Sequence, residues 1–300
     1  MVKAELCVVP QAFDFSSGIE NLTFSLKEFL ELRDKMASDF IIFTRSNDFY
    51  IQIAEEFNSG SIENGWAMSF FFDGFNKISE VDLSVGDLFE IANSSPPNHN
   101  GRWISLYNSR ADMSLLINNK NSISSEQDLV DYCTHILTEN KREHSLYSKD
   151  IQDIYKNIIF LNYPDHAQYK SFDSLRKMEG GYKNFQGAIS RFLCFVNSYT
   201  VIPNDSLKNI EIMNASSLEF PVTPEGKGKK KRAAKDLKRD FLINNVVYKD
   251  INCEFHYKLE RIDGANGNGQ YYFNRIYFGF FKQLDPKKPK ICIAHIGEHL

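Results

Sequence analysis

The chain has 300 residues, of which 42% are hydrophobic and 25% are charged, and its formal net charge is −4. This composition is typical of globular proteins and excludes global disorder, while the length favours two domains of ordinary size. Because the net charge is slightly negative, the chain as a whole is not a polycation that coats nucleic acids or anionic membranes, so an affinity of that kind has to be local.

The sequence lacks the patterns of a membrane segment, a secretory signal and a zinc site. No run of about 18 apolar residues occurs, and residues 1–10 are too short for the apolar region and cleavage site of a signal peptide. The five cysteines are odd in number, widely spaced and mostly flanked by apolar residues, as reduced and buried thiols are. No closely spaced Cys or His pair predicts a metal site. We expect a cytoplasmic protein with no membrane contact, no metal and no cofactor.

Apolar runs and helical patterns alternate along the first 120 residues. Five runs are predicted to be strands: residues 5–9, 40–44, 66–72, 102–107 and 113–117. Apolar residues at helical spacing predict helices over residues 23–36 and 49–57. Proline, asparagine and serine predict a loop over residues 93–101. Residues 1–120 are therefore predicted to form a mixed α/β domain.

Residues 121–220 are predicted to be a helical region. Ser124 followed three residues later by Gln127 is typical of a capping box, which predicts that a helix begins there. Two further helices are predicted from the spacing of apolar residues, over residues 149–161 and 182–199. The first of these is expected to end before Pro164, because proline disfavours helical geometry in the residue that precedes it.

The character of the sequence changes between residues 221 and 240. Eight of the thirteen residues from Lys227 to Arg239 are lysine or arginine, a composition typical of a solvated linker or arm. Four strands are predicted after this basic linker: residues 241–248, 252–259, 271–280 and 290–296. Because these strands are short and follow one another, residues 241–300 are predicted to form an antiparallel β-rich domain. The whole chain is predicted to be α+β.

Polar and apolar side chains alternate along the second of these strands. Because successive side chains of a strand point to opposite faces, Glu254, His256 and Lys258 are expected on one side of the strand and the apolar residues on the other. A carboxylate, an imidazole and an ammonium together are the groups that acid–base chemistry on a charged substrate requires. This strand is therefore a candidate for a catalytic role.

The last two strands supply further candidates. Arg275 and Tyr277 lie among aromatic residues, a setting that suits a bidentate phosphate contact and the stacking of bases. On the final strand, alternation places His295 and His299 on the same face as the apolar residue Ile291. Both histidines lie close to the C-terminus.

Over residues 227–300 the order of these residues resembles the C-terminal half of the RelE/YoeB superfamily of small ribonuclease toxins. In that superfamily a basic turn leads to a strand with Glu and Lys, then to a strand with Arg, and then to a final strand that closes with His. Glu254, Lys258, Arg275 in the phrase NRIYF, and His299 follow the same order. The resemblance implies that Glu254 is the general base, that Arg275 binds phosphate, and that His299 or His295 is the general acid. It also implies RNA cleavage without a metal, with the 2′-hydroxyl as the nucleophile.

We therefore expect an RNA-directed effector, a metal-independent ribonuclease of toxin type in a bacterial antiphage defence or toxin–antitoxin system. RNA is expected rather than DNA. The residues expected to contact it are Lys229, Lys230, Lys231, Arg232 and Tyr277. The N-terminal region is expected to sense, inhibit or recruit through a protein partner or inhibitor. Two alternatives stay open: a non-catalytic protein that binds nucleic acid or an acidic protein, and a subunit of a larger defence assembly.

Overall fold

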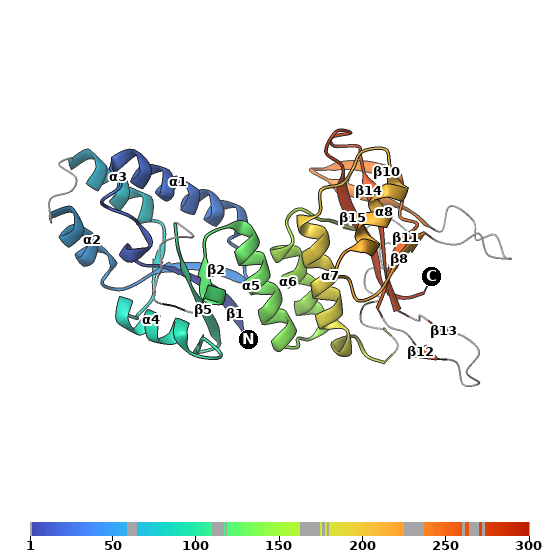
Figure 1. The fold of residues 1–300 in the computed structure, drawn as a ribbon, viewed down its shortest axis with the longest axis horizontal. Helices are drawn as coiled ribbons and strands as arrows, with labels where there is room; N and C mark the ends of the chain where they lie inside the picture. Colours follow the sequence, from blue (N-terminus) through green and yellow to red (C-terminus); the bar gives the residue numbers. More distant parts are fainter. Residues whose placement is uncertain are drawn as a thin grey trace. The chain divides into compact units, whose positions relative to one another are not determined.

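The computed structural model divides the chain into two compact units, Met1–Ile136 and Leu137–Leu300 (Figure 1). The residues that it describes are 2–58, 65–109, 117, 119–162, 175, 178, 180–224, 237–259, 262–263, 270–271 and 274–299. Both units contain helices and strands, so the fold is α+β, as the sequence predicted. The predicted separation between a helical region and a β-rich domain does not appear as a boundary, because the helices after residue 137 share one unit with the C-terminal strands.

A six-stranded sheet forms the centre of the N-terminal unit. Its strands are β1 (Lys3–Val8), β2 (Ile41–Arg45), β3 (Ser79–Glu80), β4 (Asn98–His99), β5 (Arg102–Tyr107) and β6 (Ser122–Ile123). They follow the order β3-β2-β1-β5-β4, and β6 pairs with β5. The pairing of β4 with β5 is antiparallel and the other pairings are parallel. The central strands β1 and β5 are buried along most of their length, as strands covered on both faces of a parallel sheet are.

Helices cover both faces of this sheet. Figure 1 shows α1 (Ile19–Met36) and α3 (Gly65–Phe75) on one side and α4 (Val85–Asn93) on the other. The other helical elements of the unit are η1 (Pro10–Ala12), α2 (Phe49–Asn58), η2 (Asn119–Asn121) and α5 (Glu126–Glu139). Ser84 and Asp87 form a complete capping box that fixes the start of α4.

The prediction of a strand over residues 66–72 was wrong, because α3 covers them. A short apolar run is compatible with a buried strand and with a buried helix, and in the structure these residues are helical. Phe71 and Phe75 lie one turn apart, their rings are 5.1 Å apart, and Phe75 also meets Phe29 of α1 at 5.6 Å. Gly74 allows the close approach, since a Cβ there would lie 3.1 Å from the Leu26 side chain. The aromatic core of this unit therefore forms around two packed helices.

The start of α5 differs from the prediction, and one predicted strand lies mostly outside the described residues. The helix α5 begins two residues after Ser124, and the residue that caps it is Asp128 instead of Gln127. The backbone N–H and the hydroxyl of Ser124 both donate to the Asp128 carboxylate. The backbone N–H of Asp128 donates to the Ser125 hydroxyl. The predicted strand at residues 113–117 lies outside the described residues, apart from Ile117.

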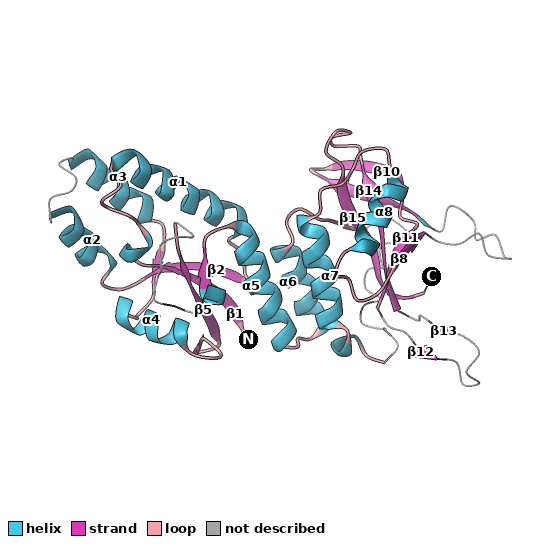
Figure 2. Ribbon diagram, viewed as in Figure 1, coloured by secondary structure: helices cyan, strands magenta, loops and turns pink. Residues whose placement is uncertain are grey.

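The C-terminal unit is built on a five-stranded sheet in the order β7-β15-β14-β11-β8. Figure 2 shows β8, β11, β14 and β15 of this sheet in magenta. The strands of the unit are β7 (Ile159–Phe160), β8 (Val222–Pro224), β9 (Lys238–Ile243), β10 (Val246–Asn252), β11 (Phe255–Lys258), β12 (Ile262–Asp263), β13 (Gln270–Tyr271), β14 (Asn274–Phe281) and β15 (Lys290–Glu298). Its helices are α6 (His144–Ile154), η4 (Tyr182–Asn184), α7 (Gln186–Ser198) and α8 (Ser206–Ala215). The neighbouring strands β8, β11, β14 and β15 are antiparallel, and β7 runs parallel to β15.

Different elements pack on the two faces of this sheet. On one face, Phe192 of α7 stacks on Tyr257 with ring centroids 4.4 Å apart and also contacts Phe278. On the other face, the β9–β10 hairpin packs over the end of β14, where Phe241 meets Phe281. Gly279 makes this crossing possible, because a Cβ there would lie 2.1 Å from the backbone oxygen of Asn252. The rest of this second face is left for polar side chains.

Three predicted elements of this unit differ from the structure. Residues 241–248 are two strands that reverse at Asn244 and Asn245, whose positive φ values of 49° and 63° are typical of a two-residue hairpin turn. The helix predicted over residues 149–161 ends at Ile154, and β7 follows it. The strand predicted over residues 252–259 is interrupted at residues 253–254, where the chain passes from β10 to β11. None of the described helices is long and apolar enough to cross a membrane.

Candidate nucleic-acid interface

Two rows of polar side chains lie next to each other on the second face of the C-terminal sheet. The strand register pairs His256 with Tyr277 and Tyr277 with His295, and the neighbouring row pairs Lys258 with Arg275. Side chains that are directly opposite in an antiparallel sheet point to the same face, as do side chains two residues apart on one strand. The five side chains therefore share one face.

The first row, His256–Tyr277–His295, is buried. Its three side chains are 3%, 1% and 2% exposed, and the Tyr277 ring lies between the two imidazoles at centroid distances of 5.4 and 5.7 Å. His256 Nε2 and the Thr223 hydroxyl are 2.9 Å apart, and His295 Nε2 donates to the backbone carbonyl of Glu298 at 2.8 Å. These contacts fix the orientation of both imidazole rings.

His256 is neutral at neutral pH. Burial, followed by the positive charges of Arg275, Lys258 and His299, lowers its pKa from the ordinary value to about 3, although a hydrogen bond with the Glu254 backbone acts in the opposite direction. A neutral imidazole accepts a hydrogen bond at one ring nitrogen and donates one at the other. In its neutral form His256 therefore adds no positive charge to this face.

The second row is cationic. Lys258 and Arg275 are half-buried register partners on β11 and β14. Burial lowers the pKa of Lys258, and the neighbouring Arg275 charge lowers it further. Two adjacent positive charges repel each other, so an anion bound across the pair is favoured by both. A guanidinium beside an ammonium is a suitable contact for a phosphate group.

The structure places the predicted site residues in different surroundings. Glu254 lies on the connection between β10 and β11, half-buried, and meets His256 through its backbone. His299 follows the end of β15 and is exposed, and its charge acts on His256. Tyr277 is enclosed by two histidine rings, so it does not form an exposed surface on which a base stacks. Lys229, Lys230, Lys231 and Arg232 lie outside the described residues.

The alternation expected for the last strand is broken by a bulge. His295 pairs with Tyr277, but the next pair is Phe278 with Ile293, so the register shifts at Ala294. His295 therefore points to the polar face, whereas Ile291 and Ile293 lie on the apolar face. Sequence alternation had assigned His295 and Ile291 to one face, and this assignment was wrong.

Sequence reasoning did not predict the roles of two residues of this face. The charges of Arg275, Lys258 and His299 all act on His256, and its position two residues before Lys258 was the available signal. Thr223 holds His256 from β8, a strand of only three residues that the apolar pattern did not reveal. Pairing between distant strands determined both positions.

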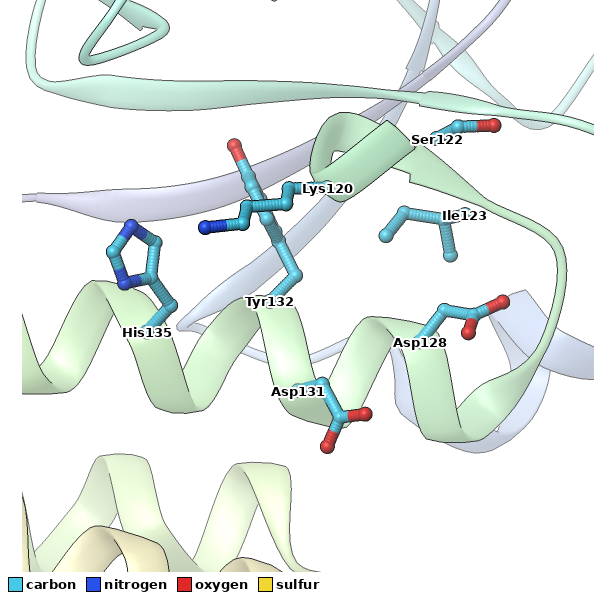
Figure 3. Close-up of a pocket in the computed structure, with 7 residues that line it drawn as sticks. All are labelled: Lys120, Ser122, Ile123, Asp128, Asp131, Tyr132 and His135. Atoms are coloured by element: carbon cyan, nitrogen blue, oxygen red, sulfur yellow. The ribbon is translucent and has the colours of Figure 1, made fainter. Parts of the chain in front are cut away.

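The N-terminal unit contains a cavity of a different character (Figure 3). It has a volume of about 360 Å³ and lies between α5 and the segment that leads into β6. In Figure 3 the Lys120 ammonium extends toward His135, whereas the Asp131 carboxylate points away from Lys120. The Asp128 carboxylate already accepts hydrogen bonds at the start of α5, and the Tyr132 hydroxyl donates to the Ile104 carbonyl. Because the charges are mixed and two polar groups are engaged, this cavity defines no ligand chemistry.

Neither a metal site nor a similar protein indicates a function for this face. Within the described part of the chain, no group of three or more His, Cys, Asp or Glu side chains is arranged to hold a metal ion. No protein-family model, no curated protein and no solved structure matches this chain.

Proposed function

We propose that the polar face of the C-terminal sheet binds the phosphate backbone of RNA and cleaves it, as the active surface of an RNA-directed effector. The observation that carries the proposal is the pairing of Lys258 with Arg275 beside a row that contains two imidazoles. Cations next to proton-transferring groups are what phosphodiester cleavage requires. RNA fits this chemistry better than DNA, because its 2′-hydroxyl supplies the nucleophile.

Each side chain has a role in this proposal. Arg275 and Lys258 hold the phosphate and stabilise the negative charge that develops on it. Glu254 is the proposed general base, and His299 or His295 the proposed general acid, in keeping with the resemblance to the RelE/YoeB toxins. No step of this chemistry needs a metal or a cofactor. The biological setting that we propose is a cytoplasmic toxin or an antiphage defence protein whose N-terminal unit receives a signal or binds an inhibitor.

A second function is favoured by the burial of the polar row. His256, Tyr277 and His295 are each at most 3% exposed, which suits a rigid scaffold for the cationic row as well as it suits catalysis. In that case the face binds nucleic acid or an acidic protein without cleaving it, alone or as a subunit of a larger defence assembly.

Cleavage of a labelled RNA by the purified full-length chain tests the proposal. Product formation in the presence of EDTA is expected, and Arg275→Ala is expected to slow it by about 100-fold or more, as loss of a charge-stabilising donor does. Glu254→Ala is expected to abolish cleavage while RNA binding is retained. Lys249→Ala is the matched control, because Lys249 is an exposed lysine of β10.

The two candidate functions give different results. Salt-sensitive RNA binding that Arg275→Ala weakens, without cleavage by any form of the chain, would assign the face to binding alone. Absence of both binding and cleavage would remove the RNA assignment. Growth arrest on expression of the full chain, relieved by Glu254→Ala, would support the toxin setting.

A further inference from the structure

A lysine-rich cavity lies in the C-terminal unit, at the end of β14 that is remote from Arg275. The cavity has a volume of about 440 Å³. Asn157, the end of α7 with the three residues that follow it, and the start of β15 with the loop before it form its walls. Arg275 is near the start of β14 and the loop follows its last residue, Phe281, so about 20 Å of extended strand separates the two regions.

The charge of this cavity is positive. Lys287, Lys288 and Lys290 line it, and none of its described lining residues is acidic. No ion pair joins any of the three lysines to another described residue. The nearest carboxylate in the sequence, Asp285, accepts a hydrogen bond from the backbone N–H of Lys287 at 2.8 Å. Three cationic side chains therefore surround a hollow without an acidic partner in its described wall.

An amide side chain with a fixed orientation also lines the cavity. Asn197 is 4% exposed and lines the cavity. Its Oδ1 accepts a hydrogen bond from the backbone N–H of Asn157 at 3.0 Å, which fixes the orientation of the amide group. The Nδ2 group then has no hydrogen-bond partner among the described residues. The Nδ2 group is therefore available to donate a hydrogen bond to a ligand in the cavity.

We propose that this cavity binds a free nucleotide, with its phosphate groups against the three lysines and its nucleoside against Asn197 and Tyr199. Lysine is a common phosphate contact, and the volume suits a small organic ligand better than it suits an isolated inorganic phosphate. Tyr199 provides a fixed wall, because its hydroxyl donates to Asn209 at 2.9 Å. The site is separate from the polar face and goes beyond the function proposed for that face.

Calorimetric titration of the full-length chain with ATP, and separately with inorganic pyrophosphate, tests this proposal. ATP is expected to bind, and pyrophosphate is expected to bind more weakly because it lacks the nucleoside. The double variant Lys287→Ala/Lys288→Ala is expected to weaken ATP binding by about tenfold, as loss of two exposed ion pairs does. Lys282→Ala is the control: it removes one lysine charge from the same loop, but Lys282 donates a hydrogen bond to Asn204 and does not line the cavity.

A second variant tests the buried amide. Asn197→Asp keeps an oxygen that accepts from the Asn157 N–H but replaces the two donors by a negative charge, so ATP binding is expected to be lost. The titration is made at a temperature at which circular dichroism shows the variant to be folded. Absence of ATP binding, an equal effect of Lys282→Ala, or binding of an RNA oligonucleotide without binding of ATP would each overturn the proposal. Arg275→Ala is expected to leave ATP binding unchanged, so failure of the RNA assignment and failure of this one are distinguishable.

Discussion

Lys258 on β11 and Arg275 on β14 are direct register partners, and the charge of Arg275 helps to lower the pKa of the Lys258 ammonium. Two like charges in this position destabilise the sheet slightly, because directly opposite like charges repel each other. A protein retains such a pair at little cost where an anion binds across it. Mutation of either member of this pair is therefore expected to weaken anion binding by the polar face.

The salt dependence of RNA binding is expected to change with each member of this pair. Binding that neutralises phosphates releases counterions, so the slope of log affinity against log salt is expected to fall by about 0.7 for each lost contact with a single strand. Lys258→Met and Arg275→Gln are each expected to reduce the slope by this amount, and fluorescence anisotropy at several salt concentrations measures it. An unchanged slope in both variants, with Lys249→Ala as the control, would place the phosphate contacts elsewhere.

The stability of the chain is expected to depend on the protonation of His256. Its pKa is about 3 in the folded state, so between the ordinary histidine value and pH 3 the unfolded chain binds a proton that the folded chain does not. Stability is therefore lost as the pH falls below about 6.5. In His256→Gln this loss is absent, and the stability advantage of the natural chain over the variant is expected to shrink by about 2 kcal/mol between pH 7 and pH 5. Urea unfolding followed by circular dichroism measures the free energy of unfolding of the natural chain and of the variant at each pH. A difference in stability between them that stays constant with pH would contradict the burial of a neutral His256.

Substitution of Gly279 is expected to separate the β9–β10 hairpin from the sheet. The added Cβ of Gly279→Ala would lie 2.1 Å from the Asn252 oxygen, a backbone atom that cannot rotate away. Destabilisation by about 3 kcal/mol or more is expected, with loss of the packing of Phe241 on Phe281. Gly86→Ala in α4 is the control, since its nearest neighbour is 3.7 Å away and alanine favours the helix. Equal stability of the two variants would mean that the hairpin does not cross β14 at this point.

The sequence predicted the parts of the fold that depend on local pattern. Arg275 and Tyr277 do share a face, because period-two alternation holds along the uninterrupted strand β14. The bulge at Ala294 reversed the assignment of His295 relative to Ile291, and no residue type in that strand signals it. The turn at Asn244 and Asn245 had a usable signal, since asparagine tolerates positive φ, but the flanking residues also fitted one continuous strand.

Long-range packing determined what local pattern did not. The apolar run in α3 is a helix because Phe71 and Phe75 both pack in the core one turn apart. Thr223 reaches His256 only because β8 pairs with β11 across 33 residues of sequence. The types of residue in the candidate site could therefore be predicted from the sequence, whereas their burial and hydrogen bonds could not.

A buried ion pair in the C-terminal unit gives the last prediction. Arg142 Nη1 and Asp150 Oδ2 are 2.8 Å apart, and their side chains are 5% and 8% exposed. Burial raises the pKa of Asp150 to about 6, although the Arg142 charge acts in the opposite direction. Arg142→Met leaves a buried carboxylate without its partner, so destabilisation by about 3–5 kcal/mol is expected at pH 8.

The same variant is expected to be less destabilised at acidic pH. A folded-state pKa raised above the unfolded value means that the folded chain binds the extra proton, so stability is regained as the pH falls through that pKa and Asp150 becomes neutral. Urea unfolding at pH 8 and pH 5 measures the difference, and Arg142→Met/Asp150→Leu is expected to recover most of the loss because both charges are gone. Lys183→Ala is the control, since it breaks the exposed pair of Lys183 with Glu143 and is expected to change stability by less than about 1 kcal/mol. A loss in Arg142→Met that matches this control at pH 8 would show that the Asp150 carboxylate is hydrated and that the pair is not buried.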